Sequence, residues 1–200
     1  VTLLLSLAAR TSCTANLSVS TLRALIGSAE PGAPLALELP EGAVFSLGGA
    51  QLEVPSGANV TIVSEGEGAT IDGEGLSRIF EVSNNTALSL RRVHLLNGAA
   101  DLVVPGDVEA AGGGCVRVSG GNASVSIADA AVRGCRTEHD GGAVHVSDGA
   151  TARLENVSAF DSSAANHGGV VYAYSSTVDI AGNLAAANSS ASSGGVVYAY

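Results

Sequence analysis

Three side chains that can do chemistry stand at one position of a repeated segment. Glu81, Arg117 and His145 form the middle of the stretches FEV, VRV and VHV. If successive repeats stack in register, these side chains lie about 5 Å apart on one surface. An acid, a permanent cation and a titratable base in this order could abstract the proton next to a carboxylate, as a polysaccharide lyase must. A solvated row of charges is the other interpretation, because one Glu is a poor cage for Ca²⁺.

All four tyrosines of the chain fall on the same predicted surface. Tyr172 and Tyr198 continue the row of His145, and Tyr174 and Tyr200 stand two residues further along. Stacked repeats would place the four rings in a platform of about 5 by 7 Å between ring origins. Rings that combine apolar area with a hydroxyl suit a sugar or a protein partner, but the same stacking could serve stability alone.

The sequence offers no second catalytic pattern and no pattern for a metal. A further outward row has no carboxylate pair of the kind a glycoside hydrolase uses; it consists of Ser89, Ser126, Arg153 and Asp179. No Cys/His spacing resembles a zinc site. We therefore expect no metal, no cofactor and a protein that is not an enzyme, with a polysaccharide lyase or glycoside hydrolase as the alternative.

The elements that position these residues repeat along the chain. Segments that begin with two glycines start at residues 113, 141, 168 and 194, so the starts are 28, 27 and 26 residues apart. A period of this length indicates a solenoid. Within each period, short segments of alternating apolar and polar residues predict three strands, and three strands per coil are typical of a right-handed parallel β-helix. The expected fold is therefore all-β.

Period-two alternation assigns the faces of the first strand in each coil. We expect one inward column of Phe80, Val116, Val144, Val171 and Val197, and a second of Val82, Val118, Val146, Ala173 and Ala199. The paired glycines should allow a sharp corner and a close approach of stacked backbones. Residues 99–112 lengthen one gap to 36 residues, from Ile79 to Cys115, and should form a loop at a corner.

The beginning of the chain differs from the repeats. Residues 18–32 predict one short amphipathic helix, with Ser18 or Ser20 as the N-cap and Pro31–Gly32 as the stop, which should cover the end of the core. Residues 1–15 are either the remnant of a signal peptide or a first strand, and the β-helix should span 16–200. The last coil is incomplete, so we expect the natural protein to continue beyond residue 200.

Two segments resemble known families. Residues 68–100, GATIDGEGLSRIFEVSNNTALSLRRVHLLNGAA, resemble the entry coils of pectin-lyase-like β-helix proteins. The Gly-Gly repeats resemble those of the polymorphic outer-membrane protein family of chlamydial-type adhesins. Gly141–Val144 matches the first half of that family's motif, but the second half, Phe-x-x-Asn, is missing at Phe160-Asp-Ser-Ser. The resemblance covers about residues 20–200 and implies a β-helix that acts as an adhesin, a lyase or a hydrolase.

Composition limits the partners and the compartment. The net charge of −10 argues against nucleic acid and against anionic lipid, and no segment is long enough for a transmembrane span. Asn-x-Ser/Thr sequons, which indicate a glycosylated protein outside the cell, stand at Asn16, Asn59, Asn84, Asn122, Asn156 and Asn188. Cys115 and Cys135 could form a disulfide or could be two small buried residues. We expect an extracellular or cell-surface module that binds a polysaccharide or a surface protein.

Overall fold

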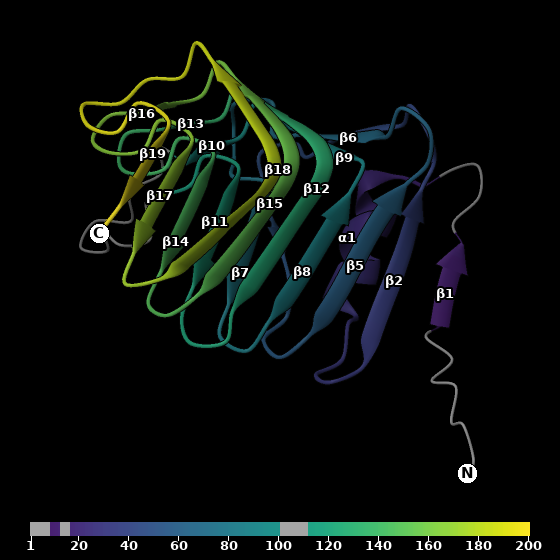
Figure 1. The fold of residues 1–200 in the computed structure, drawn as a ribbon. Helices are drawn as coiled ribbons and strands as arrows, with labels where there is room; N and C mark the ends of the chain where they lie inside the picture. The colour runs from purple at the N-terminus through teal and green to yellow at the C-terminus, as the bar shows by residue number, and fades with distance from the viewer. Residues whose placement is uncertain (1–8, 13–16, 101–111) are drawn as a thin grey trace.

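The chain forms a right-handed parallel β-helix of about six turns, as the sequence predicts (Figure 1). A computed structural model describes residues 9–12, 17–100 and 112–200, and of residues 9–12 only the backbone. Every strand pair among these residues is parallel, and neighbours in a sheet come from successive coils rather than from a hairpin. Each coil thus supplies one strand to each side of the solenoid.

Three sides and one short corner sheet make up the solenoid. The first side contains β1 (Ala9–Ser12), β2 (Pro34–Leu39), β5 (Asn59–Ser64) and β8 (Ala87–Arg91), and the second contains β3 (Val44–Ser46), β6 (Ala69–Asp72) and β9 (Val93–Leu96). In later coils β12 (Ser124–Arg133), β15 (Thr151–Phe160) and β18 (Thr177–Ala187) cover both sides. The third side contains β4 (Leu52–Glu53), β7 (Phe80–Ser83), β11 (Val116–Ser119), β14 (Val144–Ser147), β17 (Val171–Tyr174) and β19 (Val197–Ala199). The corner sheet contains β10 (Ala99–Ala100), β13 (Arg136–Thr137) and β16 (Ser163–Ala164).

Register on the third side confirms the predicted faces. Val116 pairs with Phe80 on one side and with Val144 on the other, and Val144 pairs with Val171. All four side chains are at most 1% exposed, because they stack along the axis of the solenoid and fill its interior. The last members of the two predicted inward columns differ, because β19 is the edge strand of its sheet: Val197 is 37% exposed, and Ala199 is exposed as well. Aliphatic side chains of this size are sufficient because the interior of a solenoid is narrow.

The long strands differ from the expected pairs of short ones. β12 bends at Asp129 (φ 52°) and β15 bends at Asn156 (φ 52°), so the chain turns a corner without leaving the sheet. The Asn156 Nδ2 donates to Asp129 Oδ1 at 3.2 Å, and its Oδ1 accepts from the backbone of Asn183 at 3.3 Å. Asn and Asp adopt this left-handed conformation more readily than other non-glycine residues. Alternation of side chains alone does not reveal such a bend.

The two glycines of each repeat have separate roles. The first glycine of the second pair, Gly141, has φ +69°, a left-handed conformation. Gly142 has no positive φ, but a Cβ there would lie 2.2 Å from the carbonyl oxygen of Gly169 in the next coil. A Cβ at Gly169 would likewise lie 2.2 Å from the carbonyl oxygen of Gly195. The first glycine therefore makes the corner, and the second allows successive backbones to pass in contact.

A single helix covers the N-terminal end of the core. The helix α1 (Val19–Gly27) has Ser18 as its N-cap, whose Oγ accepts from the backbone of Thr21 at 3.2 Å, and it buries Leu22 and Ile26. Arg23 donates to backbone carbonyls of the first coil, which fixes the helix to the solenoid. The helix ends at Gly27, before the expected stop at Pro31–Gly32, and turns follow.

Only part of the expected corner loop and of the N-terminal segment lies within the described residues. Residues 99–100 of the expected corner loop form β10, and 101–111 lie outside the described residues, as do 1–8 and 13–16 of the N-terminal segment. Ala9–Ser12 pairs with β2.

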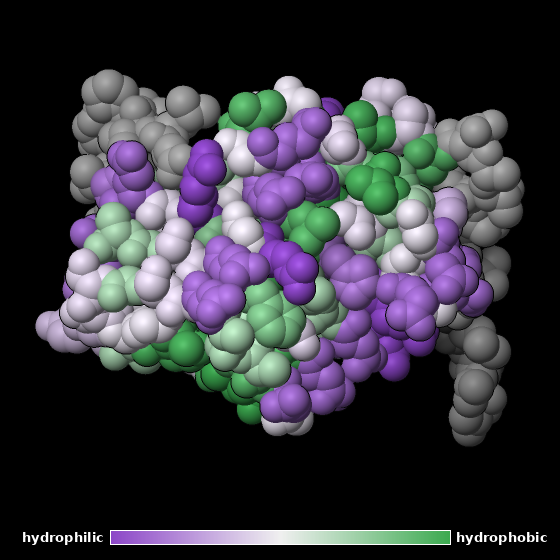
Figure 2. All heavy atoms as spheres, turned by 90° about the horizontal axis from the view of Figure 1, so that it is seen from above, coloured by the Kyte–Doolittle hydropathy of each residue, from purple (hydrophilic) through white to green (hydrophobic). Residues whose placement is uncertain are grey.

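Among the described residues no helix has the length and apolar character needed to span a bilayer. Viewed from above, the surface mixes hydrophilic side chains with small hydrophobic areas (Figure 2).

Candidate functional site

The outer face of the third side brings the predicted site residues into one row. We call the outward side chains of β4, β7, β11, β14, β17 and β19 the outer wall. Along it, Arg117 pairs with Glu81 and with His145, and Tyr172 pairs with His145 and with Tyr198. A shift of one residue in any strand would have turned these side chains into the core, so the row depends on the parallel register.

The charged half of the outer wall is internally neutralised. Glu81 accepts from Arg78 Nη1 at 2.6 Å through one carboxylate oxygen and from Arg117 Nη1 at 2.7 Å through the other. The Arg78 side chain is 8% exposed and also donates to the carbonyls of Gly112 and Gly113. Burial lowers the pKa of Arg78, and the charge of Glu81 counteracts this. Both oxygens of Glu81 thus hold cations in place.

Sequence reasoning missed Arg78, although a signal was present. The residue stands immediately before the inward Ile79, at the position that the second glycine of each pair, for example Gly114 or Gly142, occupies in later repeats. An arginine at a glycine position of a corner must direct its side chain away from the stacked backbones. Here the side chain lies along the outer wall and reaches Glu81.

His145 lies in the outward row but is shielded from solvent. Its side chain is 7% exposed, its ring centroid lies 5.0 Å from that of Tyr172, and a Cβ at Gly112 would lie 1.8 Å from its Nδ1. Burial, followed by the charge of Arg117, lowers its pKa to about 4, and the nearby Asp140 only partly offsets this. The imidazole is therefore neutral at neutral pH and is covered on the side of Nδ1.

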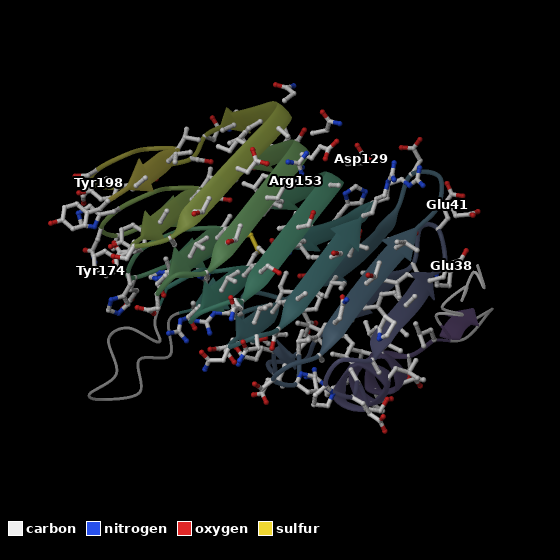
Figure 3. The ribbon with its side chains drawn as sticks, turned by 60° about the horizontal axis from the view of Figure 1, so that its bottom comes forward. Glu38, Glu41, Asp129, Arg153, Tyr174 and Tyr198 are labelled. Carbon is white, nitrogen blue, oxygen red and sulfur yellow. A yellow bond between two sulfur atoms is a disulfide. The ribbon has the colours of Figure 1, made fainter. Side chains whose placement is uncertain are left out.

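The tyrosine wall consists of Tyr172, Tyr174, Tyr198 and Tyr200. The rings of Tyr172 and Tyr198 are 5.8 Å apart with 8° between their planes, and those of Tyr174 and Tyr200 are 5.9 Å apart with 7° between them. Tyr174 is 42% exposed and Tyr200 83%. Each pair covers the ring faces between its two members, and ring edges, hydroxyls and most of Tyr200 remain exposed to solvent. Tyr174 and Tyr198 lie at one end of the solenoid, and Glu38 and Glu41 at the other (Figure 3).

A histidine and an aspartate at the corner complete this aromatic cluster. The His167 Nδ1 is 2.7 Å from Asp140 Oδ1, and the His167 backbone donates to the same oxygen at 3.1 Å. The His167 ring is 4.5 Å from that of Tyr198 and 6.0 Å from that of Tyr172. Neither residue was predicted to belong to a site. Each directly precedes a glycine pair, at Gly141 and Gly168, which is the signal that places them on neighbouring coils.

A groove borders the charged half of the outer wall. It has a volume of about 1160 Å³, and its mixed polar and apolar lining includes Arg23, Gln51, Glu53, Ser77, Arg78 and Glu81. Its arginines are already engaged, Arg23 by backbone carbonyls of the first coil and Arg78 by Glu81. The groove thus offers an acidic ligand few free donors.

The second predicted outward row lies on the first side of the solenoid. On the first side, Ser126 pairs with Ser89 and Arg153, and Arg153 bridges to Asp179 and to Glu155 at 3.2 Å. No group of His, Cys, Asp and Glu in the described ranges could hold a metal ion. These outward groups pair with one another across coils and leave no pair of carboxylates facing each other.

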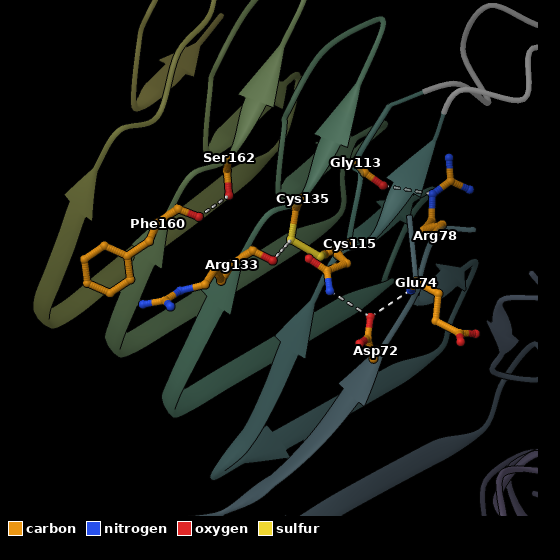
Figure 4. Close-up of a disulfide and its surroundings, with 10 residues drawn as sticks. Asp72, Glu74, Arg78, Gly113, Cys115, Arg133, Cys135, Phe160 and Ser162 are labelled. Carbon is orange, nitrogen blue, oxygen red and sulfur yellow. Dashed lines mark hydrogen bonds between the residues drawn. A yellow bond between two sulfur atoms is a disulfide. The ribbon is translucent and has the colours of Figure 1, made fainter. Parts of the chain in front are cut away.

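Cys115 and Cys135 form a disulfide with a Cα–Cα distance of 5.4 Å (Figure 4). Both residues are fully buried. The bond links the beginning of β11 to the corner that follows β12, and it therefore closes one coil on itself. The sequence alone is compatible both with this disulfide and with two small buried residues.

The sequon asparagines lie at the surface. Asn59, Asn84, Asn122, Asn156 and Asn188 are exposed, and Asn16 lies outside the described residues. The Nδ2 atoms of the last three donate to the preceding coil, to Asn85, Asp129 and Asp161 respectively, at 3.1–3.2 Å. These asparagines therefore have a structural role at the corners, which is independent of any glycan.

The fold and the outer wall define the chain as a parallel β-solenoid with an aromatic outer surface. No protein-family profile, no curated protein and no solved structure matches the chain. The resemblance to pectin-lyase-like proteins and to the adhesin repeats consequently stays at the level of the sequence pattern.

Proposed function

We propose that this chain is a non-catalytic, secreted or cell-surface β-helix module that binds its partner, a polysaccharide or a surface protein, through the tyrosine wall. The observation that carries the proposal is the placement of every tyrosine of the chain on one outward surface of two neighbouring coils. Tyrosine is enriched at binding surfaces because its large ring is apolar and its hydroxyl forms hydrogen bonds. In a chain with only 4% aromatic residues, four tyrosines on one surface are a distinct feature.

The geometry of Glu81, Arg117 and His145 supports this choice over the lyase or hydrolase. A general base has to come within hydrogen-bond distance of a substrate proton. His145 is 7% exposed and packed against Gly112, and the Glu81 carboxylate is held by two guanidinium groups. We therefore assign the three residues to the structure of the outer wall.

Binding to immobilised partners tests the proposal. The chain and its variants Tyr174→Ala and Tyr198→Ala should be applied to an array of glycans and extracellular proteins, with Ser126→Ala on the first side as the control. We expect at least tenfold weaker binding for the tyrosine variants and no change for the control. Equal binding by all four proteins would contradict the proposal. Release of unsaturated uronides from polygalacturonate that is lost in His145→Ala would establish the enzyme instead.

A further inference from the structure

We infer that the partner of the tyrosine wall is a positively charged polypeptide segment. The inference rests on the proposed function and specifies the chemistry of its ligand. It follows from the charges around the wall, from the direction in which the rings face and from the composition of the chain.

The charges that border the wall leave an acidic excess. Toward the N-terminal coils, Glu81 bridges to Arg78 and Arg117, and Glu53 is the register partner of Glu81, so two carboxylates and two guanidinium groups leave no net charge there. The charge that remains beside the tyrosines is negative and comes from Asp140 and Asp148.

Asp140 and Asp148 lie on the coil that precedes the tyrosines, Asp140 before the Gly141–Gly142 pair and Asp148 directly after β14. Asp140 contacts His167, whose ring packs against Tyr198, and its side chain is 23% exposed. Asp148 is exposed and follows Ser147, the residue that pairs with Tyr174. The whole chain carries a net charge of −10, so the overall field of the protein has the same sign as these two aspartates. A uronate polymer would be repelled here, and Lys or Arg side chains would be attracted.

The direction of the rings favours a polypeptide over a sugar. A sugar ring binds best on an open aromatic face, but the faces of Tyr172 and Tyr198 are turned toward each other, with 8° between their planes. Apart from the 83% exposed Tyr200, the groups directed outward are phenol oxygens and ring edges. Phenol oxygens accept hydrogen bonds from ammonium and guanidinium groups, and the exposed carboxylate of Asp148 can pair with the same cations.

Synthetic probes of equal length distinguish the alternatives. We propose to measure the affinity of the whole chain for a twelve-residue Lys/Ser peptide, a twelve-residue Glu/Ser peptide, polygalacturonate and cellohexaose at about 150 mM salt, where long-range attraction is screened. We expect the Lys/Ser peptide to bind at least tenfold more tightly than the other three. Tyr174→Phe, which keeps the stacked ring, and Asp148→Asn should each weaken that binding about threefold.

A matched control removes the effect of net charge. Glu38→Gln changes the charge by the same amount as Asp148→Asn, on the outer face of β2 at the opposite end of the solenoid (Figure 3). We expect this variant to bind as the unmodified chain does. Equal weakening by Glu38→Gln and Asp148→Asn, or no binding of the Lys/Ser peptide, would overturn the inference. Tyrosine-dependent binding of cellohexaose or polygalacturonate would overturn it as well but would leave the proposed function standing.

Discussion

The buried His145 should make the stability of the protein depend on pH in a defined window. Its pKa is about 4 in the folded chain and 6.5 in an ordinary environment, so the unfolded chain binds the proton first as the pH falls. Stability is therefore lost as the pH falls from 6.5 toward 4. For this difference in pKa, linkage gives a loss of about 2 kcal/mol between pH 7 and pH 5 and about 3 kcal/mol once the pH is below 4.

The groups packed around the imidazole explain the sign. Arg117 and Arg78 repel a second positive charge, and Tyr172 and Gly112 keep water away, while Asp140 gives limited compensation. In His145→Leu and His145→Gln this proton site is absent. Both variants should therefore show a flatter dependence of unfolding free energy on pH than the unmodified chain.

Urea unfolding at pH 7, 6 and 5 measures this difference directly. The relevant quantity is the change between pH values within each protein, so a lower absolute stability of either variant does not affect the comparison. The other histidines are retained in all three proteins and cancel in the difference. A slope between pH 7 and pH 5 that is the same in the unmodified chain and in both variants would refute the buried, neutral imidazole.

Three further substitutions test the packing of the coils by urea unfolding. Gly142→Ala should cost about 2–3 kcal/mol because the added Cβ would meet a backbone carbonyl of the next coil. The control Gly121→Ala should change stability by less than about 0.5 kcal/mol, because no atom lies within 4 Å of that Cβ. Equal effects of the two substitutions would argue against contact between the stacked backbones. Replacing Cys115 and Cys135 together by Ala should cost about 3 kcal/mol, since the bond joins residues 20 apart, and an unchanged midpoint with and without reductant would count against it. Glu81→Gln should cost about 3 kcal/mol because it removes the carboxylate that bridges Arg78 and Arg117, and a neutral effect would mean that the cluster is solvated.

The repeat made most of the fold predictable. Gly-Gly pairs at a nearly constant spacing fix the corner of each coil from Gly113 onward, and alternation from Val116 to Ser119 then determines which side chains face the core. The outer row of Glu81, Arg117 and His145 follows from the same two facts. Its register could therefore be predicted from local sequence alone.

Other features depend on contacts between coils, for which the sequence contains little signal. The bends at Asp129 and Asn156 result from a left-handed residue and a hydrogen bond across coils, and neither leaves a hydrophobic pattern. The burial of His145 was also missed, because an outward position normally means solvent and the cover comes from Gly112 and Tyr172. Arg78 could have been identified only by its departure from the glycine position of the repeat.

Cross-linking between coils tests the stacked outer wall most directly. Ser147 and Tyr174 are register partners on neighbouring strands, β14 and β17, whereas Ser119 lies a further coil away. Neighbouring strands are about 4.8 Å apart, within disulfide range, and strands two coils apart are not. We predict that Ser147→Cys with Tyr174→Cys forms a disulfide under mild oxidation, and that Ser119→Cys with Tyr174→Cys does not. Efficient cross-linking of the second pair, or none of the first, would contradict the parallel stacking on which the tyrosine wall depends.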